Sequence, residues 1–289
     1  MTSQAPHKTP DVWADRVDAY EALFAPFSRR VAAAALTAVE PRAGERWLDV
    51  AAGPGAVSLL AARRGARVVA VDLASPMLDR LLAAAAEEGI EGVEAHVMDG
   101  QALDFADGSF DAAASNFGVV QFPDAARGLR EMRRVLRPGA EAVVTTMHKP
   151  ARSELLTMIV RAVVEALPGY VPPEAPSAAR FTTVAGMADA LAQAGFEDVR
   201  VDIATIDWVI GDVVDFFQRW AMDAPPVAYM FEGLDTQTRR AAGKAFVRLA
   251  TARSRDGVAS FPTEVVIGVG RSAIGATTGG SRGRSPDAA

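Results

Sequence analysis

A short turn with two glycines, between an apolar strand and a helix, constrains this chain more than any other feature. The expected strand covers residues 46–50, the turn contains Gly53 and Gly55, and a helix follows at 55–64. Because glycine has no Cβ, the backbone of such a turn can approach a ligand closely. The N–H groups at the start of the helix then face that ligand. The pattern predicts a ligand site at the end of the first strand of an α/β fold.

Strands and helices continue to alternate after this turn as far as residue 148. We expect strands at 46–50, 67–72, 93–98, 110–116 and 141–147, and helices at 55–64, 76–88 and 124–136, with a helix stop at 137–139. Alternation at this spacing predicts a parallel sheet with helices on both faces. The second strand is apolar throughout 68–71, which is typical of a strand buried on both faces.

The regions outside this alternation carry other patterns. Residues 1–10 are expected to be disordered, and 11–44 to form a helical lid that Pro26 divides into two helices. After residue 150 we expect helices at 153–167, 183–194, 212–222 and 235–253, strands at 198–209 and 261–270, and a flexible tail over 272–289.

Composition limits the kinds of protein this chain can be. Its 289 residues include no cysteine, which excludes disulfides, thiolate metal sites and cysteine nucleophiles, and we expect no metal site. No apolar run is long enough to span a membrane, so a cytoplasmic location is the default. The net charge of −6 argues against a nucleic-acid partner. A local row of Arg127, Arg130, Arg134 and Arg137 is interpreted as a solvated helix face with Glu131 as an ion-pair partner.

Polar side chains follow four successive strands, at the edge where open α/β sheets bind ligands. They are Asp49 beside the glycine turn, Asp72 after the second strand, Asp99 after the third and Asn116 after the fourth. A carboxylate at Asp72 can accept hydrogen bonds from both ribose hydroxyls, and one at Asp99 can meet an adenine amino group. Three carboxylates suit a cationic ligand better than a pyrophosphate.

A dinucleotide-binding enzyme is the main competing interpretation of the glycine turn. Its fingerprint needs a third glycine or alanine where this chain has Ser58, and it offers no reason for Asp99. A nicotinamide or flavin cofactor is therefore disfavoured.

Five short segments together carry a resemblance to a known family: residues 48–55, 71–78, 99–105, 109–111 and 131–139. They resemble class I S-adenosylmethionine-dependent methyltransferases, in the small-molecule group similar to ubiquinone and menaquinone-biosynthesis enzymes. The resemblance implies a Rossmann-like sheet of seven mostly parallel strands with the last antiparallel. It also implies that residues 45–271 form the methyltransferase domain, with cap helices within 151–180 and 212–253.

The resemblance also implies roles for particular residues, with S-adenosylmethionine as the cofactor. Asp72 would bind the ribose diol, Asp99 the adenine, and Asp49 the methionine ammonium, although Asp49 could instead cap the loop. Ala51 stands where the family has its first loop glycine. The full cofactor set is Asp49, Ala51, Gly53, Gly55, Asp72, Leu73, Met77, Asp99, Gly100, Gln101 and Asn116.

Candidates for the acceptor pocket are aromatic, and core packing is the alternative for each of them. They are Tyr20, Phe24, Phe117 and Trp208, of which Tyr20 is singled out because the resemblance implies an N-terminal helix that closes over the cofactor. His148 follows the fifth strand and is the candidate general base, the alternative being a polar residue that ends a strand. His7 lies in the polar start, and His96 is interpreted as structural.

The sequence thus predicts an enzyme that transfers a methyl group to a small, largely apolar or aromatic acceptor through an O, N or C nucleophile. The alternative is a protein that binds the same cofactor but catalyses another reaction, such as a cyclisation, or serves as a binding module. Methylation of adenine or protein amides is disfavoured, because residues 116–119 lack the Asn/Asp-Pro-Pro-Tyr pattern. The sequence leaves the oligomeric state open, with a homodimer as one candidate.

Overall fold

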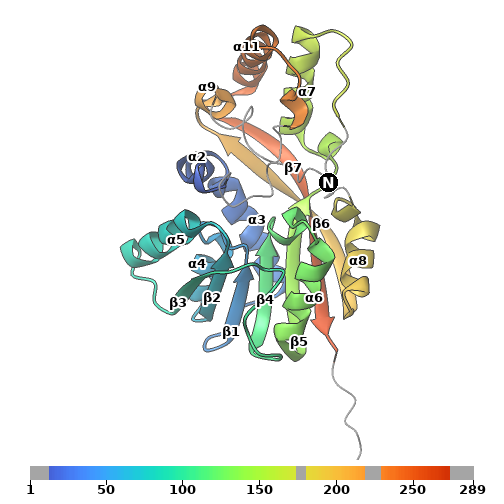
Figure 1. Cartoon of the computed structure of the whole chain (residues 1–289). Coiled ribbons are helices and arrows are strands. Elements are labelled where there is room, and N and C mark those ends of the chain that lie inside the picture. Colours follow the sequence, from blue (N-terminus) through green and yellow to red (C-terminus); the bar gives the residue numbers. More distant parts are fainter. Residues whose placement is uncertain (1–12, 174–179, 219–228, 274–289) are drawn as a thin grey trace, which may run out of the picture.

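The fold is described from a computed structural model of the chain (Figure 1). It describes residues 13–173, 180–218 and 229–273. The predicted disorder at 1–10 and nearly all of the predicted tail at 272–289 lie outside the described residues.

A sheet of seven strands organises the molecule, in the order β3-β2-β1-β4-β5-β7-β6. The strands are β1 Arg46–Val50, β2 Arg67–Asp72, β3 Val93–Val97, β4 Phe110–Asn116, β5 Leu136–Met147, β6 Phe196–Ile210 and β7 Ala259–Ser272. The first five pair in parallel, and β7 runs antiparallel to both β5 and β6. The predicted Rossmann-like class with an antiparallel last strand is confirmed.

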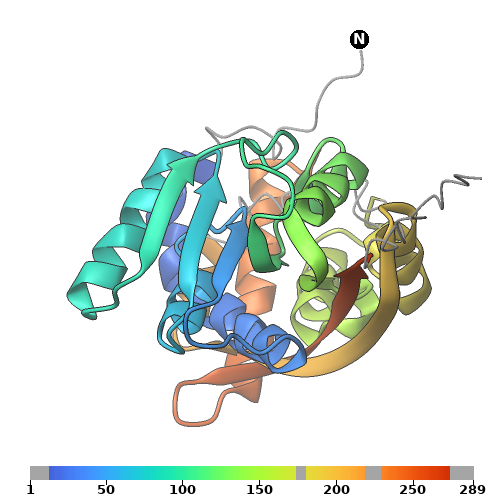
Figure 2. The same cartoon turned by 90° about the horizontal axis from the view of Figure 1, so that it is seen from below.

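Helices cover both faces of this sheet (Figure 2). The helices on the first face are α3 Ala25–Ala38, α4 Ala56–Ala62 and α5 Ser75–Glu87, and those on the second are α6 Ala125–Val135 and α8 Val184–Gln193. Side chains alternate between the two layers, so that Trp47 packs into the first and Leu48 into the second. Burial on both sides explains why the strands are apolar throughout.

A cap stands above the carboxyl edge of the sheet on the extended ends of β6 and β7 (Figure 1). It contains η3 Pro150–Arg152, α7 Glu154–Ala166, α9 Val213–Phe216, η6 Tyr229–Phe231 and α11 Thr236–Arg253. Its apolar centre includes Phe216, Phe246 and Phe261, all nearly inaccessible to solvent. Of the helix predicted at 212–222, α9 lies within the described residues and 219–228 lie outside them. The division into lid, domain and cap segments stays a prediction.

The N-terminal segment forms two helices, as its sequence predicts. Helix α2 spans Val17–Leu23, the helices meet at Phe24, and Pro26 occupies the first turn of α3. Proline is tolerated there because the first helical N–H groups have no intrahelical acceptor. Arg80 of α5 pairs with Asp18 at 2.7 Å and Glu21 at 2.7 Å, which ties α2 to the main domain.

Helix α6 ends just before the predicted stop at 137–139, but the stop residues themselves lie within strand β5. Helix α6 ends at Val135 and β5 begins at once with Leu136, which pairs with Phe110. The Pro-Gly pair is absorbed as an irregularity inside the strand, where Gly139 has a φ of +82° and the register to β4 shifts. Arg137 therefore lies on a strand and pairs with Asp111 instead of extending the arginine row of α6.

Candidate active site

The glycine turn after β1 is held by the acid at the end of β2. The carboxylate of Asp72 accepts hydrogen bonds from the backbone N–H of Gly53 at 2.9 Å and from that of Ala74 at 2.9 Å. Three residues of the turn have positive φ, namely Ala51 at +56°, Gly53 at +53° and Gly55 at +85°. Ala51 thus adopts the left-handed conformation that glycine favours, at the position where the family has glycine.

Space over this turn is open to a ligand. A Cβ built on Gly53 would meet no atom within 4 Å. On Gly55 it would lie 2.1 Å from Leu81 Cδ1 of α5, so a side chain here would displace Leu81, and the φ of +85° independently favours glycine. One glycine therefore offers bare backbone to a ligand and the other leaves room for Leu81.

Asp49 is a buried carboxylate with an internal role. It is 2% exposed, and its Oδ2 accepts hydrogen bonds from Ser58 N at 3.0 Å and Ser58 Oγ at 2.7 Å. Burial raises the pKa of Asp49 to about 7, against the lowering effect of the Ser58 bonds. The expected alternative, that Asp49 caps the loop, fits this geometry, since Ser58 lies in the first turn of α4. The contact also explains why serine occupies the place of a third glycine.

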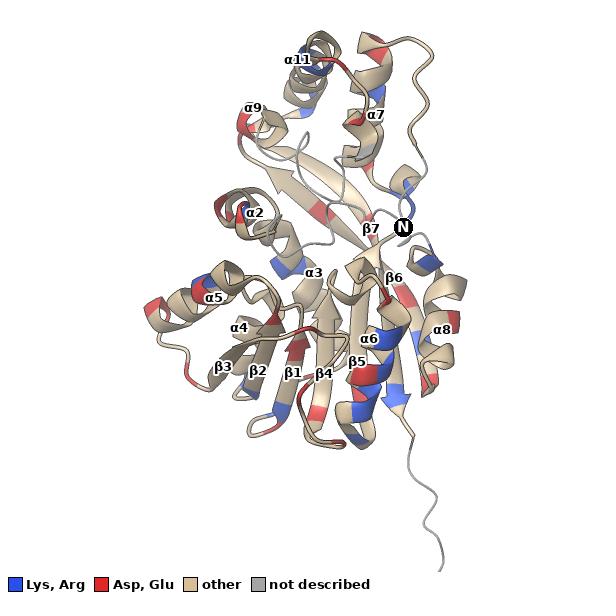
Figure 3. Ribbon diagram, viewed as in Figure 1, with Lys and Arg blue, Asp and Glu red and all other residues tan. Residues whose placement is uncertain are grey.

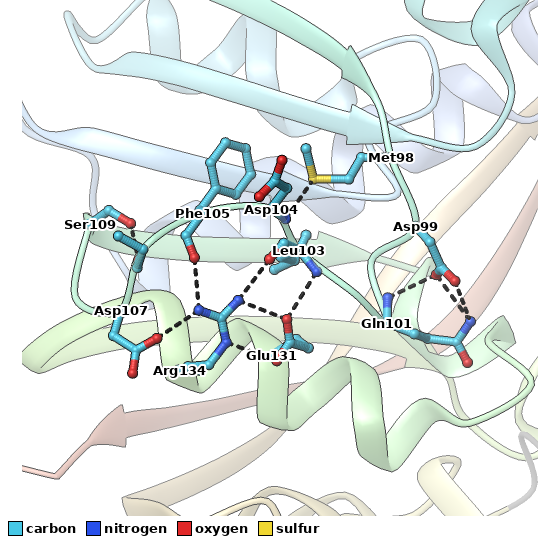
Figure 4. A network of polar contacts seen from close by, with 11 residues as sticks. Met98, Asp99, Gln101, Leu103, Asp104, Phe105, Asp107, Ser109, Glu131 and Arg134 are labelled. Atoms are coloured by element: carbon cyan, nitrogen blue, oxygen red, sulfur yellow. Dashed lines mark hydrogen bonds and ion pairs between the residues drawn. The ribbon is translucent and has the colours of Figure 1, made fainter.

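The segment after β3 presents Asp99 and is fixed from α6 (Figure 4). Asp99 Oδ1 accepts a hydrogen bond from the Gln101 backbone N–H at 2.8 Å. Gln101 Oε1 in turn accepts one from the Asp124 backbone N–H at 2.8 Å, at the start of α6. Gly100 is buried, and a Cβ there would lie 2.7 Å from Val50 Cγ1. The backbone of this loop therefore lies directly against the end of β1.

Arg134 of α6 anchors the rest of that loop. Its guanidinium donates to the carbonyls of Leu103 at 2.8 Å and Phe105 at 2.7 Å (Figure 4). It also pairs with Glu131 at 2.8 Å, and Glu131 Oε2 accepts from the Leu103 N–H at 2.9 Å. The interpretation of the arginine row as a solvated face is thus wrong for Arg134, although its predicted ion pair with Glu131 is confirmed.

A buried chain of polar contacts joins the ends of β4 and β5 to helix α3. Thr145 Oγ1 donates to Asn116 Oδ1 at 2.7 Å, and Asn116 Nδ2 donates to Ser28 Oγ at 2.9 Å. Ser28 also hydrogen-bonds the Tyr20 hydroxyl. Burial raises the pKa of Tyr20, and the negative charges of Asp72 and Asp49 act in the same direction. Tyr20 therefore lies within electrostatic reach of both acids of the cofactor candidate set. Sequence reasoning missed Ser28 and Thr145, whose spacing carries no signal.

The aromatic candidates form one continuous cluster. Phe24 has its ring centroid 5.0 Å from that of Tyr20, 5.4 Å from that of Phe117 and 5.3 Å from that of Trp208. Trp208 is 3% exposed and stacks on Phe27 at 4.4 Å, so its surroundings are those of a core side chain. Phe117 is partly exposed and has a φ of +64°, which sets it apart from the regular strand that precedes it.

The remaining candidates differ in exposure. Met77 is buried beside Val17 and Ala74, whereas Leu73 is 41% exposed after β2. His148 lies directly after β5 with its side chain 12% exposed. His96 lies in β3 and is half exposed, with its ring 6.4 Å from that of Phe105, and its interpretation as a structural residue stays a prediction.

The charge distribution fits a cationic ligand at this edge. Acidic positions lie toward the upper ends of β1 and β2, while α6 carries mixed charges (Figure 3). The three carboxylates, the open backbone at Gly53 and the fixed Asp99 loop suit an adenosyl sulfonium with a ribose diol and an ammonium group. Within the described residues, no helix has the length and apolar character needed to cross a membrane.

Comparison with known proteins decides the family. A family model described as "Methyltransferase domain" matches residues 48–144. Nocamycin O-methyltransferase of Saccharothrix syringae is 36% identical over 198 residues, which cover 63% of this chain and 69% of that protein. The chain belongs to the S-adenosylmethionine-dependent methyltransferases.

Two further proteins place this methyltransferase among its relatives. A demethylmenaquinone methyltransferase of Clavibacter sepedonicus is 42% identical over 116 residues, covering 39% of this chain but only 45% of that protein. The YcgJ protein of Bacillus subtilis has the same fold, with a TM-score of 0.56, 18% identity and coverage of 84% of this chain and 97% of that one. The resemblance to small-molecule methyltransferases and the predicted cofactor are thus confirmed.

Proposed function

We propose that this methyltransferase acts on a small, largely apolar or aromatic acceptor through an oxygen, nitrogen or carbon nucleophile. The proposal is supported chiefly by two sets of side chains, one acidic and one aromatic, that lie next to each other at one edge of the sheet. Three carboxylates end neighbouring strands there, and the aromatic cluster around Phe24 adjoins them through Tyr20. Two relatives are named for nocamycin and demethylmenaquinone, which supports an acceptor of the same size class.

Within this proposal, each strand end holds one part of the cofactor. Asp72 would accept hydrogen bonds from the ribose hydroxyls, the Asp99 segment would receive the adenine, and Asp49 would pair with the methionine ammonium. When bound, S-adenosylmethionine supplies a methyl group already activated by a positive sulfur. The work left to the chain is to hold the acceptor in line and to exclude water.

The acceptor pocket is proposed to lie between the helices α2 and α3 and the cap. Tyr20, Phe24 and Phe117 are the side chains proposed to line it. The burial of Trp208 supports a role behind the pocket wall, where it keeps Phe24 and Phe27 in place. An apolar wall of this kind suits a flat ring better than a charged acceptor.

His148 is the proposed general base for a hydroxyl or carbon nucleophile. Its place directly after β5 puts it at the carboxyl edge of the sheet, which is the edge that holds the other candidates. A neutral imidazole can accept the acceptor's proton at one ring nitrogen.

The proposal also covers the cellular location, the assembly and the partners of the protein. We propose a cytoplasmic location, a homodimer as the candidate assembly and no nucleic-acid partner. The acidic balance of 36 Asp and Glu against 30 Lys and Arg supports the last of these.

The direct test uses the purified full chain with methyl-labelled S-adenosylmethionine and a panel of phenols, hydroquinones and aromatic carboxylic acids. Mass spectrometry should show a labelled methyl group on at least one ring compound, together with formation of S-adenosylhomocysteine. Cofactor binding without transfer to any of these, but with a change in an acceptor's structure at constant mass, would favour the cyclisation alternative.

A further inference from the structure

A histidine and a glutamate that are far apart in sequence lie side by side at the top of the sheet. Strand β5 pairs with β7 up to Met147 and Val265, and the His148 backbone N–H then donates to the Glu264 carbonyl at 2.9 Å. In their side chains, His148 Nδ1 lies 3.9 Å from Glu264 Oε2. The imidazole is 12% exposed and the Glu264 side chain 27%. The backbone bond fixes the relation between the two residues, because it belongs to the antiparallel ladder.

The Nδ1 atom of His148 is buried and makes no hydrogen bond within the part of the chain that the structure describes. A neutral imidazole carries its proton on one nitrogen and a lone pair on the other. A lone pair on Nδ1 would face the negative carboxylate, whereas a proton there gains a charge-assisted hydrogen bond after a small side-chain rotation. The pair therefore favours the tautomer with the proton on Nδ1 and the lone pair on Nε2.

Glu264 is itself restrained on its other side. Arg152 Nη1, from the short helix η3, lies 3.7 Å from Glu264 Oε1. Glu264 also lines a surface cavity of about 450 Å³ together with Arg152 and Glu154. Glu154 pairs with Arg253 in that cavity, so it offers a second carboxylate in the same surroundings.

We propose that Glu264 is a positioning residue for His148. It holds the proton on Nδ1, keeps Nε2 available to accept the acceptor's proton, and faces the positive charge that the imidazole then carries. This inference rests on the proposed role of His148 as the base. It identifies a residue more than a hundred positions away in sequence, which acts through His148 and does not touch the acceptor.

The tautomer can be measured without knowing the acceptor. The chain has only three histidines, His7, His96 and His148. In ¹⁵N-labelled protein, His96→Gln removes the His96 signals and His7→Gln removes the His7 signals. The ring signals present in both variants are therefore those of His148. Two-bond and three-bond ¹H–¹⁵N correlations then report which ring nitrogen of His148 carries the proton at a pH where the ring is neutral. We expect Nδ1–H to dominate in the parent and Nε2–H to dominate after Glu264→Ala.

The matched control is Glu154→Ala, which removes a carboxylate from the same cavity and should leave the His148 tautomer unchanged. Nε2–H as the main form in the parent protein, or a Glu264→Ala protein with the parent's tautomer, would overturn the proposal. Calorimetric titration of the same samples with S-adenosylhomocysteine tests the proposed function separately, because Glu264 lies outside the cofactor candidate set. Absence of S-adenosylhomocysteine binding by the parent protein would count against the proposed function and leave the tautomer result intact.

Discussion

The Asp72 carboxylate accepts a hydrogen bond from the Gly53 backbone N–H at 2.9 Å, so the acid that ends β2 also shapes the turn that follows β1. Replacing Asp72 with alanine removes this bond and the one from Ala74. Each unsatisfied N–H costs about 1–3 kcal/mol, so both stability and cofactor affinity should fall, the affinity by at least about tenfold. Thermal unfolding and calorimetry with S-adenosylhomocysteine measure the two losses. The exposed Asp79 on α5 is the control, and Asp79→Ala should change neither quantity.

Buried Asp49 should make the free protein less stable as the pH rises. Its pKa of about 7 in the folded state lies above the value of about 3.9 for an unfolded chain. Between these two values the folded state holds the extra proton, so its stability is complete below about pH 4 and is lost as pH rises through about 7. The loss amounts to up to about 4 kcal/mol. Urea unfolding at pH 5 and pH 8 should show a difference that Asp49→Asn reduces. Burial also raises the pKa of Asp72, so part of the difference should remain in that variant. An Asn variant with the parent's full difference would contradict this account.

The same carboxyl should release a proton when the cofactor binds at pH 6. An ammonium group pairs with the ionised form of Asp49, whereas the free protein at that pH holds mostly the protonated form. Calorimetric heats of S-adenosylmethionine binding should therefore differ between two buffers with unlike ionisation enthalpies, and the affinity should rise up to about pH 8. Equal heats in both buffers would show that Asp49 does not ionise on binding. Asp49→Asn should abolish the buffer dependence.

Gly118, directly after Phe117, should tolerate no side chain. A Cβ at this position would lie 2.4 Å from the Cβ of Ala51 and 2.9 Å from Ser115 Oγ. The backbone sets the place of the Ala51 Cβ, and hydrogen bonds to Val50 O and from Val119 N hold the Ser115 hydroxyl. Gly118→Ala should therefore push the β4 loop away from the turn after β1, at a cost of about 1–3 kcal/mol in unfolding free energy, with weaker cofactor binding. Gly211→Ala is the matched control, since a Cβ there would meet nothing within 4 Å. Chemical denaturation measures the unfolding free energies of both variants. Equal values for Gly118→Ala and Gly211→Ala would refute the predicted clash.

The strand positions and the strand-end acids could be predicted from local patterns, because each depends on a few neighbouring residues. Apolar runs define β1 and β2, and the glycine turn between β1 and α4 requires the positive φ values that the structure shows. Local patterns placed the end of α6 correctly but missed the start of β5, because the Pro-Gly pair at 138–139 lies within that strand instead of in a turn before it. Pairing of Leu136 with Phe110 outweighs the turn signal, and that pairing is a contact across the sheet.

The parts of the site that could not be predicted depend on contacts between distant elements. Arg134 is spaced like a surface residue of α6, yet its guanidinium meets the Leu103 and Phe105 carbonyls of a loop about thirty residues earlier. Likewise, Glu264 reaches His148 only because β7 returns antiparallel beside β5. Periodicity reports which face of an element is apolar, but it carries no information on which polar side chains meet across the fold.

Tyr20 and Ser28 should be energetically coupled across the junction of α2 and α3. Ser28 hydrogen-bonds the Tyr20 hydroxyl and accepts from Asn116 Nδ2 at 2.9 Å, and it is only 1% exposed. Tyr20→Phe and Ser28→Ala each remove one end of this buried contact. The double variant should be more stable than the sum of the two losses implies, by about 1 kcal/mol.

The cycle is measured by urea unfolding of the four proteins, with S-adenosylhomocysteine affinity as a second readout. Thr37→Ala provides the comparison on the same helix, since its hydroxyl bonds only the Ala34 carbonyl of α3 among the described contacts. Paired with Tyr20→Phe, it should give additive losses. Additivity in the Ser28 cycle as well would mean that the Tyr20–Ser28 contact does not hold the lid helix, which would then depend on the Tyr20–Phe24 ring contact and the Arg80 ion pairs. Coupling in stability together with coupled loss of affinity would instead show that the polar chain from Thr145 to Tyr20 links the lid to the cofactor edge of the sheet.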